Sequence, residues 1–490
     1  MESIKCNTNL SGQDYNNWSW AHLILFVSIG YLSFFFNSYF PTYPIVNFLI
    51  QILLPLTILY FLTNSVFFSL LLLVLNDIFL VNQSIYLSSI GIPFARSILL
   101  LLLFLIFSYK AAISKVNFSK MGLVVLFYGI VFPCILIVLS LIMGNSKLSL
   151  IIQDVLWVFP LLIFFPLKHS LLRYKFKIFI PWIISISLLQ FLFSLTISLS
   201  PRNIGIILYK QYSNIAADEI VISHAENLEG FLENASTSFI LAYITFYLCF
   251  LVLIFKNINY LKTISILLLM LISISPLLID NLRGPLLSAF IVLLLLILMT
   301  VTKRISFRII FIITLLLFIV FFVLLYFYSI IPELFSSYFE IFGSSDSAMG
   351  AVRSQQQFFL IDEFKSNWVF GRGLGAGLSN GFSRSSSGVD FELQYHMFLY
   401  KYGLFFFLIQ FVPIIWLVIR FIRLPKLLNS SGYSTFSMVQ SAILLAILAN
   451  LIASYTNPYL KTGFLTGLIG VFLAMFFVSY TCIPTERLKK

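Results

Sequence analysis

The segment 371–377, with the sequence GRGLGAG, has residue types that could bind phosphate. Glycines such as Gly373 and Gly375 let backbone N–H groups point into a concavity that suits phosphate oxygens. Arg372 would add a planar donor that can hold an oxyanion through two hydrogen bonds. A flexible turn is the alternative interpretation, because no strand and helix flank the segment as they do in a dinucleotide-binding fingerprint.

A carboxylate and an imidazole follow where the chain enters its next apolar run, FELQYHMFLYKYGLFFF. Glu392 and His396 are four residues apart, so they share a face if the helix begins this early. Such a pair could act as the general base that takes a proton from a hydroxyl group. The alternative is an ordinary helix start, where an acidic residue is favourable in any case.

Two further arginines lie at the ends of apolar runs. Arg283 shares a tight turn with Asp280, on the side of the membrane that carries few basic residues. Because an arginine there opposes the usual charge bias, it favours a specific anionic partner; a neutralising pair with Asp280 is the alternative. Arg202 follows Pro201 and could face the same anion.

The segment 350–366, GAVRSQQQFFLIDEFKS, mixes apolar and polar residues at roughly helical spacing. It predicts a helix at the membrane surface, with Phe359 and Phe364 towards lipid and Arg353 towards the site. A helix packed on the rest of the protein explains the same pattern equally well.

The composition indicates the kind of fold that must position these candidate residues. Of 490 residues, 60% are hydrophobic and only 10% are charged, against about 25% in ordinary soluble domains. A soluble protein could not bury this much apolar surface, so the surrounding medium must be lipid. A cytosolic enzyme, a secreted domain and a disordered chain are excluded, and the long unbroken apolar runs disfavour a β-barrel.

Apolar runs of about 20 residues predict an all-α polytopic membrane protein with about 14 transmembrane helices. The predicted spans are 20–40, 43–62, 65–82, 88–108, 121–143, 149–166, 178–200, 236–255, 263–280, 285–302, 309–331, 397–420, 436–456 and 463–480. Most of the 30 basic residues fall in the breaks on one side. That bias predicts that both termini are cytoplasmic.

The chain 1–490 is predicted to form a single integral membrane domain with two long loops on the outer side of the membrane. The loops 201–235 and 332–396 hold five and seven of the 18 acidic residues. Long loops in compact proteins usually carry function, and the second loop contains most of the candidate residues above. Function is therefore expected at the outer boundary of the membrane.

Ionisable residues at membrane depth are costly and are usually paired or functional. Asp77 and Arg96 lie near the outer ends of adjacent predicted spans and are expected to pair with each other. Asp154 and Lys401 each lie inside a predicted span.

No metal and no cofactor are expected, because the histidines are not at ligand spacing and no CxxC pair exists. The formal net charge of +12 is mostly a topology signal, so no nucleic-acid partner is expected.

The order of these motifs resembles that in the bacterial O-antigen polymerases of the Wzy type and their relatives, the O-antigen ligases. The motifs are an LRGPLLSAF turn, an arginine-bearing helix, FGRGLGAG and an E…YH…L…YGL helix start. The resemblance covers about residues 270–420. It implies a GT-C-like helical glycosyltransferase of the inner membrane. Such an enzyme would join polyprenyl-diphosphate-linked oligosaccharide repeat units at the periplasmic face, without a metal.

The resemblance also implies roles for the candidate residues. Arginines would hold the diphosphate leaving group and stabilise its developing charge, and Glu392 or His396 would take the proton of the acceptor hydroxyl. The implied diphosphate-binding residues are Arg283, Arg353, Arg372, Gly373 and Gly375, with Arg202 as a secondary candidate. The ligases have a histidine followed by asparagine near this point, whereas His396 is followed by Met397, which favours a polymerase.

Two other functions remain open. An O-antigen ligase, which transfers finished glycan to a lipid A-core acceptor, would share the fold and the donor. A lipid-linked oligosaccharide flippase would instead need charged groups in a central cavity and only short outer loops.

Expected partners are the lipid-linked oligosaccharide, membrane lipid and a chain-length regulator protein.

Overall fold

The computed structural model describes the chain in separate segments. The described residues are scattered positions between 24 and 60 and the segments 65–79, 95–113, 119–144, 147–173, 179–199, 240–256, 258–279, 283–301, 348–378, 391, 393–424, 435–454 and 463–482. Within these segments all regular secondary structure is helical. The described part of the chain contains five helices that are long and apolar enough to cross a membrane. The protein is therefore an all-α, multi-pass membrane protein, as the composition predicts.

Predicted spans that fall in the described segments are occupied by helices. The continuous ones are α4 (Val66–Phe79), α5 (Ala95–Ile113), α10 (Phe179–Leu199), α14 (Ile240–Phe255), α15 (Tyr260–Ile279), α16 (Arg283–Val301), α20 (Gln394–Ile422), α22 (Thr435–Ala453) and α23 (Gly463–Cys482). The predicted span 309–331 and the loop 201–235 lie outside the described residues, and the loop 332–396 is described only in part. The described helix α5 begins at Ala95, within the span predicted from residue 88, and residues 88–94 lie outside the described residues.

Two predicted spans are composite helices. The first consists of α6 (Lys120–Leu126), the π-helical turn η3 (Phe127–Val131) and α7 (Phe132–Met143). The second consists of α8 (Leu148–Gln153), the 3₁₀-helix η4 (Leu156–Ile163) and α9 (Phe164–Arg173). In the second, Pro160 has no N–H to donate to the carbonyl one α-helical turn earlier, which disfavours continuous α-helix. The discontinuity leaves Asp154 at the end of α8.

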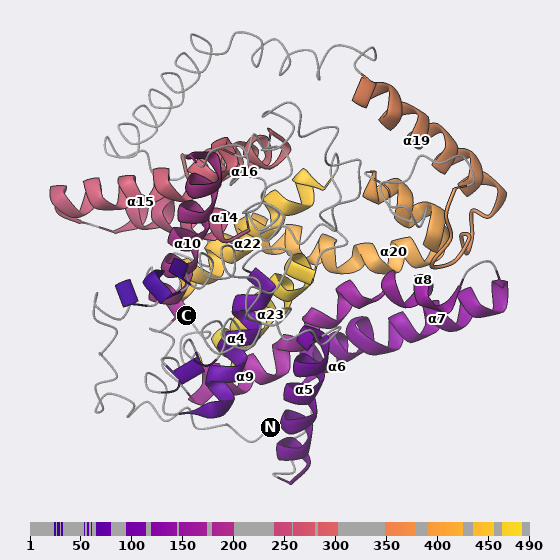
Figure 1. Ribbon diagram of the computed structural model, residues 1–490, viewed down its shortest axis with the longest axis horizontal. Coiled ribbons are helices and arrows are strands. Elements are labelled where there is room, and N and C mark those ends of the chain that lie inside the picture. The colour runs from indigo at the N-terminus through magenta and orange to yellow at the C-terminus, as the bar shows by residue number, and fades with distance from the viewer. Residues whose placement is uncertain are drawn as a thin grey trace.

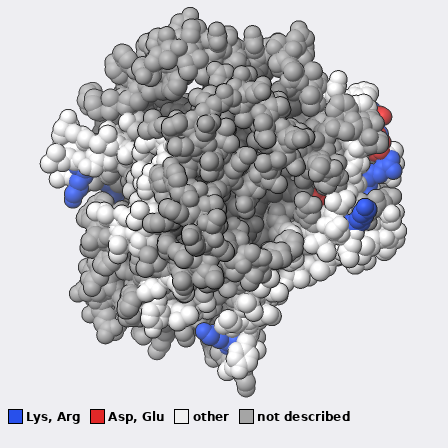
Figure 2. All heavy atoms as spheres, viewed as in Figure 1, with Lys and Arg blue, Asp and Glu red and all other residues white. Residues whose placement is uncertain are grey.

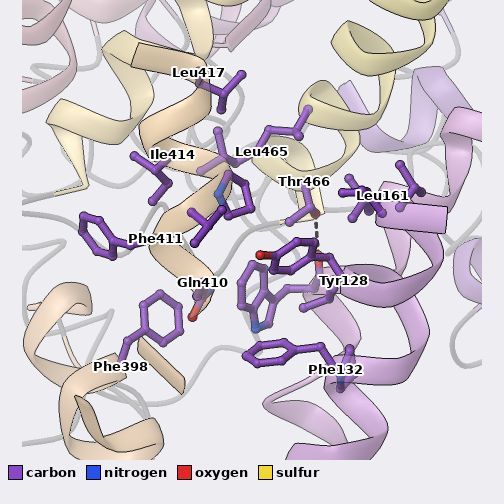
Figure 3. A pocket seen from close by; sticks show the side chains of 18 of the residues that line it. Tyr128, Phe132, Leu161, Phe398, Gln410, Phe411, Ile414, Leu417, Leu465 and Thr466 are labelled. Carbon is purple, nitrogen blue, oxygen red and sulfur yellow. Dashed lines mark hydrogen bonds between the residues drawn. The ribbon is translucent and has the colours of Figure 1, made fainter. Parts of the chain in front are cut away.

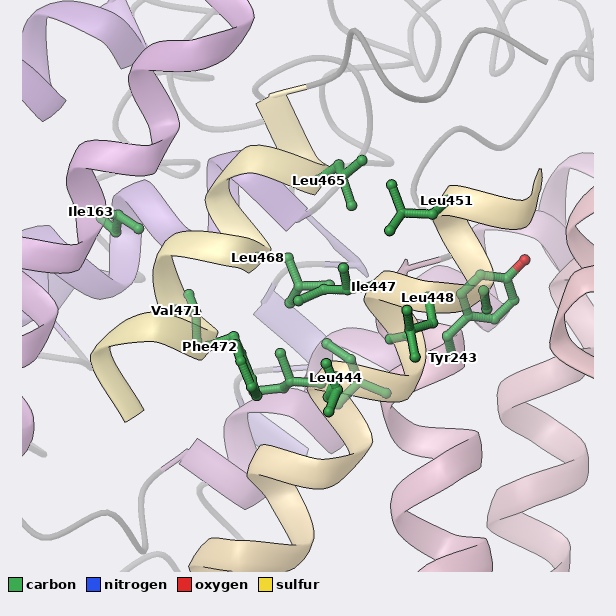
Figure 4. Close-up of a cluster of buried hydrophobic side chains, with 14 of the residues drawn as sticks. Ile163, Tyr243, Leu444, Ile447, Leu448, Leu451, Leu465, Leu468, Val471 and Phe472 are labelled. Atoms are coloured by element: carbon green, nitrogen blue, oxygen red, sulfur yellow. The ribbon is translucent and has the colours of Figure 1, made fainter. Parts of the chain in front are cut away.

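The best-buried element is α22, which packs against α14, α16 and α23. Figure 4 shows how its leucines and isoleucine meet those of α23: Leu451 lies near Leu465, and Ile447 lies near Leu468. The alanines of α22, such as Ala442 and Ala446, are fully buried. Small residues let helices approach closely, which supports association by van der Waals packing where lipid is as apolar as the helices themselves.

The helix α19 (Ala348–Ser366) packs against α20, and Figure 1 shows it along one edge of the molecule beside α20. The predicted helix over 350–366 is thus confirmed. Its buried side chains include Gln356 and Leu360, so this face packs on the protein. Phe359 and Phe364, which were expected to face lipid, are only half-buried, and Phe358 is the exposed aromatic at 66%. Acidic and basic side chains gather together at this edge in Figure 2.

Candidate functional site

The site forms where the segment 366–378 folds into a break in α20. The break is at Gly403, whose backbone (φ 65°, ψ 175°) is not helical. The break leaves backbone groups without partners inside the helix, and these groups form hydrogen bonds with the segment 366–378 instead. The bonds run from the N–H groups of Arg372, Gly373, Leu404 and Phe405 to the carbonyls of Tyr400, Lys401, Trp368 and Val369, over 2.9, 3.0, 2.8 and 3.2 Å respectively. Irregular backbone at membrane depth is tolerated when its polar groups are satisfied in this way.

Two glycines cross at this junction with almost no space between them. Gly371 and Gly403 both have positive φ, at 73° and 65°. A Cβ atom on Gly371 would lie 2.4 Å from the carbonyl oxygen of Lys401, and one on Gly403 would lie 2.4 Å from the backbone nitrogen of Gly371. Both contacts are with backbone atoms, which cannot rotate away. The conformation and the close approach therefore both require glycine.

The N–H groups of the next residues are bonded within the protein. Leu374 donates to Ser140 Oγ of α7 over 2.7 Å, and Gly375 donates to Asp154 Oδ2 over 2.6 Å. Because Gly373 also donates to a protein carbonyl, neither Gly373 nor Gly375 offers its N–H to a ligand. The N–H groups of these two glycines therefore do not form the predicted phosphate cradle in this structure. Most of the segment 371–376 is buried.

Beneath this segment lies a buried ion pair. Lys401 Nζ lies 2.6 Å from Asp154 Oδ2, and each side chain is 1% exposed. The same carboxylate oxygen accepts the N–H of Gly375, and Trp157 Nε1 donates to the carbonyl of Asp154 over 2.8 Å. Burying two charges carries a large desolvation penalty that only close pairing and further hydrogen bonds offset. The pair thus ties α8, α20 and the glycine-rich segment together.

Arg372 projects from the same segment to the outside of the junction. Its guanidinium Nη2 lies 2.6 Å from Glu363 Oε2 of α19, and 3.4 Å from Ser366 Oγ. The two charged side chains are 37% and 41% exposed. The guanidinium is therefore accessible to the oxygen atoms of a ligand. Tyr400 adds a further tie on this side, since its hydroxyl donates to the carbonyl of Gly377 over 3.0 Å.

Of the two residues predicted as the general base, the structure describes His396, whereas Glu392 lies outside the described residues. The helix α20 begins at Gln394, with Leu393 as its N-cap. The early helix start on which a shared face of Glu392 and His396 depends is therefore not observed. His396 is half-buried in the first turn of α20. It lies one turn before Tyr400, so helical spacing puts it on the face that contacts the glycine-rich segment.

The other predicted arginines can be placed only by their backbone. Arg283 is the first residue of α16, and Arg353 lies in the second turn of α19. Their side chains, and all of Arg202, lie outside the described residues. The same holds for the side chains of Asp77 and Arg96, whose predicted pairing stays a prediction.

These features define a class: a helical, multi-pass membrane protein in which one arginine-bearing segment is anchored by a buried ion pair. Comparison of the chain with protein-family models, with curated proteins and with solved structures finds no match.

Gly403→Ala should destabilise the protein strongly, because the substitution adds a Cβ in a left-handed conformation and drives it into backbone atoms of 369–371. We expect a loss of at least about 3 kcal/mol, well above the roughly 1–2 kcal/mol of left-handed backbone alone. Gly144→Ala is the matched control: Gly144 has φ 67°, yet nothing lies within 4 Å of its added Cβ. Thermal unfolding of the purified variants measures both. Equal losses would show that the crossing of the two glycines is not tight.

Proposed function

We propose that the protein is a membrane glycosyltransferase that polymerises polyprenyl-diphosphate-linked oligosaccharide repeat units, in the manner of the O-antigen polymerases of the Wzy type. The observation that carries the proposal is the half-exposed guanidinium of Arg372, held 2.6 Å from Glu363 on an anchored segment. A fixed, always-protonated planar donor suits an oxyanion that gains charge during a reaction. The resemblance of residues 270–420 to these polymerases supplies the substrate class.

In the proposed reaction the acceptor hydroxyl attacks the anomeric carbon of the donor's reducing-end sugar. A new C–O glycosidic bond forms, the bond from that carbon to the diphosphate oxygen breaks, and polyprenyl diphosphate leaves with the electron pair. Arg372 would stabilise the leaving group, and Glu363 would orient the guanidinium before substrate binds. Arg283 and Arg353 remain proposed co-donors, with Arg202 secondary. His396 or Glu392 would take the hydroxyl proton.

The proposal places the protein in the bacterial inner membrane, with about 14 GT-C-like spans, both termini in the cytoplasm and the segment 332–396 at the periplasmic face. Its product would be lipopolysaccharide O-antigen or a related surface polysaccharide. The described helices supply an apolar body, and the charged side chains Glu363, Lys365 and Arg372 lie together on one edge of it. A lipid-linked sugar has an apolar chain and a charged diphosphate, so an apolar body with charged side chains at one edge suits a reaction at the boundary between membrane and water.

Deletion of the gene from its host, followed by complementation, tests the proposal. We expect the deletion strain to carry surface chains of a single repeat unit, and the complemented strain to recover the full ladder of chain lengths on a polysaccharide gel. Accumulation of long lipid-linked polymer in the deletion strain would identify a ligase instead. Repeat units retained at the cytoplasmic face would identify a flippase.

A further inference from the structure

A cavity of about 380 Å³ lies within the membrane-spanning part of the protein, between the composite helix α6–η3–α7, η4, α20 and α23. Figure 3 shows aromatic side chains around it, among them Tyr128, Phe132, Phe398 and Phe411. Its wall also includes Val124 and Val412, which are exposed on the outside of the helices. The cavity therefore reaches the surface that faces lipid, and an apolar molecule could enter from the membrane.

Several polar groups in the wall are accounted for by the protein itself. Pro413 has no N–H to donate to the carbonyl of Ile409, and the hydroxyl of Tyr128 donates to that carbonyl over 2.9 Å instead. The hydroxyl of Tyr395 donates to the carbonyl of Leu451 over 2.7 Å. Asp154, the one charged residue of the wall, pairs with Lys401. These groups need no ligand.

One polar group in the wall has no such explanation. Among the described residues, none donates a hydrogen bond to the buried Oε1 atom of Gln410. A buried polar group without a partner costs about 1–3 kcal/mol, and such groups in native proteins call for an explanation. A ligand that supplies a donor for Gln410 would remove this cost.

We infer that the cavity binds the hydroxyl end of an uncharged lipid chain, that is, a long-chain alcohol or the free hydroxyl of a neutral glyceride. The aromatic wall fits the chain. The hydroxyl donates to Gln410 Oε1. An anionic headgroup does not fit, because the one charged side chain among the described residues of the wall is the carboxylate of Asp154. The inference is independent of the proposed glycosyl transfer.

Quenching of tryptophan fluorescence tests the inference, because Trp157 and Trp416 line the cavity. Bromine quenches tryptophan on contact, so the probes are 11-bromoundecan-1-ol and 1-bromoundecane, added to the purified full-length protein in detergent. The four other tryptophans are replaced by phenylalanine in all samples. We expect the alcohol to quench at about tenfold lower concentration than the bromoalkane, as one additional satisfied hydrogen bond in an apolar site predicts.

Variants separate specific binding from partition into the micelle. Gln410→Leu should abolish the tenfold preference for the alcohol while the bromoalkane quenches as before. Gln410→Leu should also raise the melting temperature without ligand, since it removes an unsatisfied buried acceptor. Tyr260→Phe, at an exposed position remote from the cavity, should change nothing. Equal quenching by both probes in the parent protein, or a preference that survives Gln410→Leu, would overturn the inference.

Discussion

Lys401→Met should destabilise the protein by about 3–5 kcal/mol, the usual cost of removing one partner of a buried ion pair. The variant would leave Asp154 charged and 1% exposed, without the ammonium group that offsets its charge. The anchor of the glycine-rich segment should loosen at the same time. Thermal unfolding in detergent measures the loss of stability, and limited proteolysis within 366–378 measures the release of the segment.

The double variant Asp154→Asn with Lys401→Met isolates the contribution of charge. Asparagine keeps an oxygen that can accept from Gly375, and no uncompensated charge remains. Replacing a buried ion pair by neutral groups is often close to neutral in stability, so the double variant should recover most of the loss. Lys365→Ala is the control, because its pair with Asp362 spans 3.6 Å and is largely exposed; it should shift stability by less than about 1 kcal/mol. A Lys401→Met protein as stable as its parent would contradict the buried pair.

The helices could be predicted from the sequence because their cause is local. Long apolar runs need lipid, and in lipid a helix satisfies its own backbone, so the described helices lie close to the predicted spans. The helix α19 was also predictable from the spacing of its apolar residues. Which aromatic side chain of α19 is exposed was not predictable, because the exposure of Phe358 or Phe359 depends on the rotation of α19 about its axis as it packs against α20.

The junction could not be predicted because its partners are distant in sequence. Asp154 and Lys401 are each conspicuous as charges inside apolar spans, and their opposite signs were the available signal for a pair. The pairing itself joins residues 247 positions apart. The glycines of 371–377 suggested a phosphate cradle, but their N–H groups meet Ser140 and Asp154, which lie more than 200 positions earlier. Nothing within the segment indicates these acceptors. Glu363 was missed as the partner of Arg372 although it lies only nine positions earlier, because the contact depends on how the segment 366–378 folds against α19.

Arg372→Ala should lower the rate of polymer formation about a hundred-fold or more, the usual cost of removing one donor to a developing oxyanion. Protein level and melting temperature should hold, because the side chain is 37% exposed and its exposed ion pair contributes little to stability. Arg372→Lys should recover activity only in part, since it keeps the charge but loses the planar fork. The ladder of chain lengths in cells and the rate with purified lipid-linked repeat units measure the effect.

Glu363→Gln and Lys365→Ala complete the set around Arg372. Glutamine can still accept a hydrogen bond from the guanidinium but no longer competes with a diphosphate through its charge, so Glu363→Gln should retain more activity than Arg372→Ala. Lys365→Ala removes an exposed basic side chain from the same edge and should leave the ladder unchanged. The two kinds of variant should differ in what they lose. Lys401→Met, which removes the buried ion pair, should lose stability and activity together. Arg372→Ala, which removes the proposed diphosphate donor, should lose activity alone. A full ladder from Arg372→Ala would mean that the diphosphate is bound elsewhere.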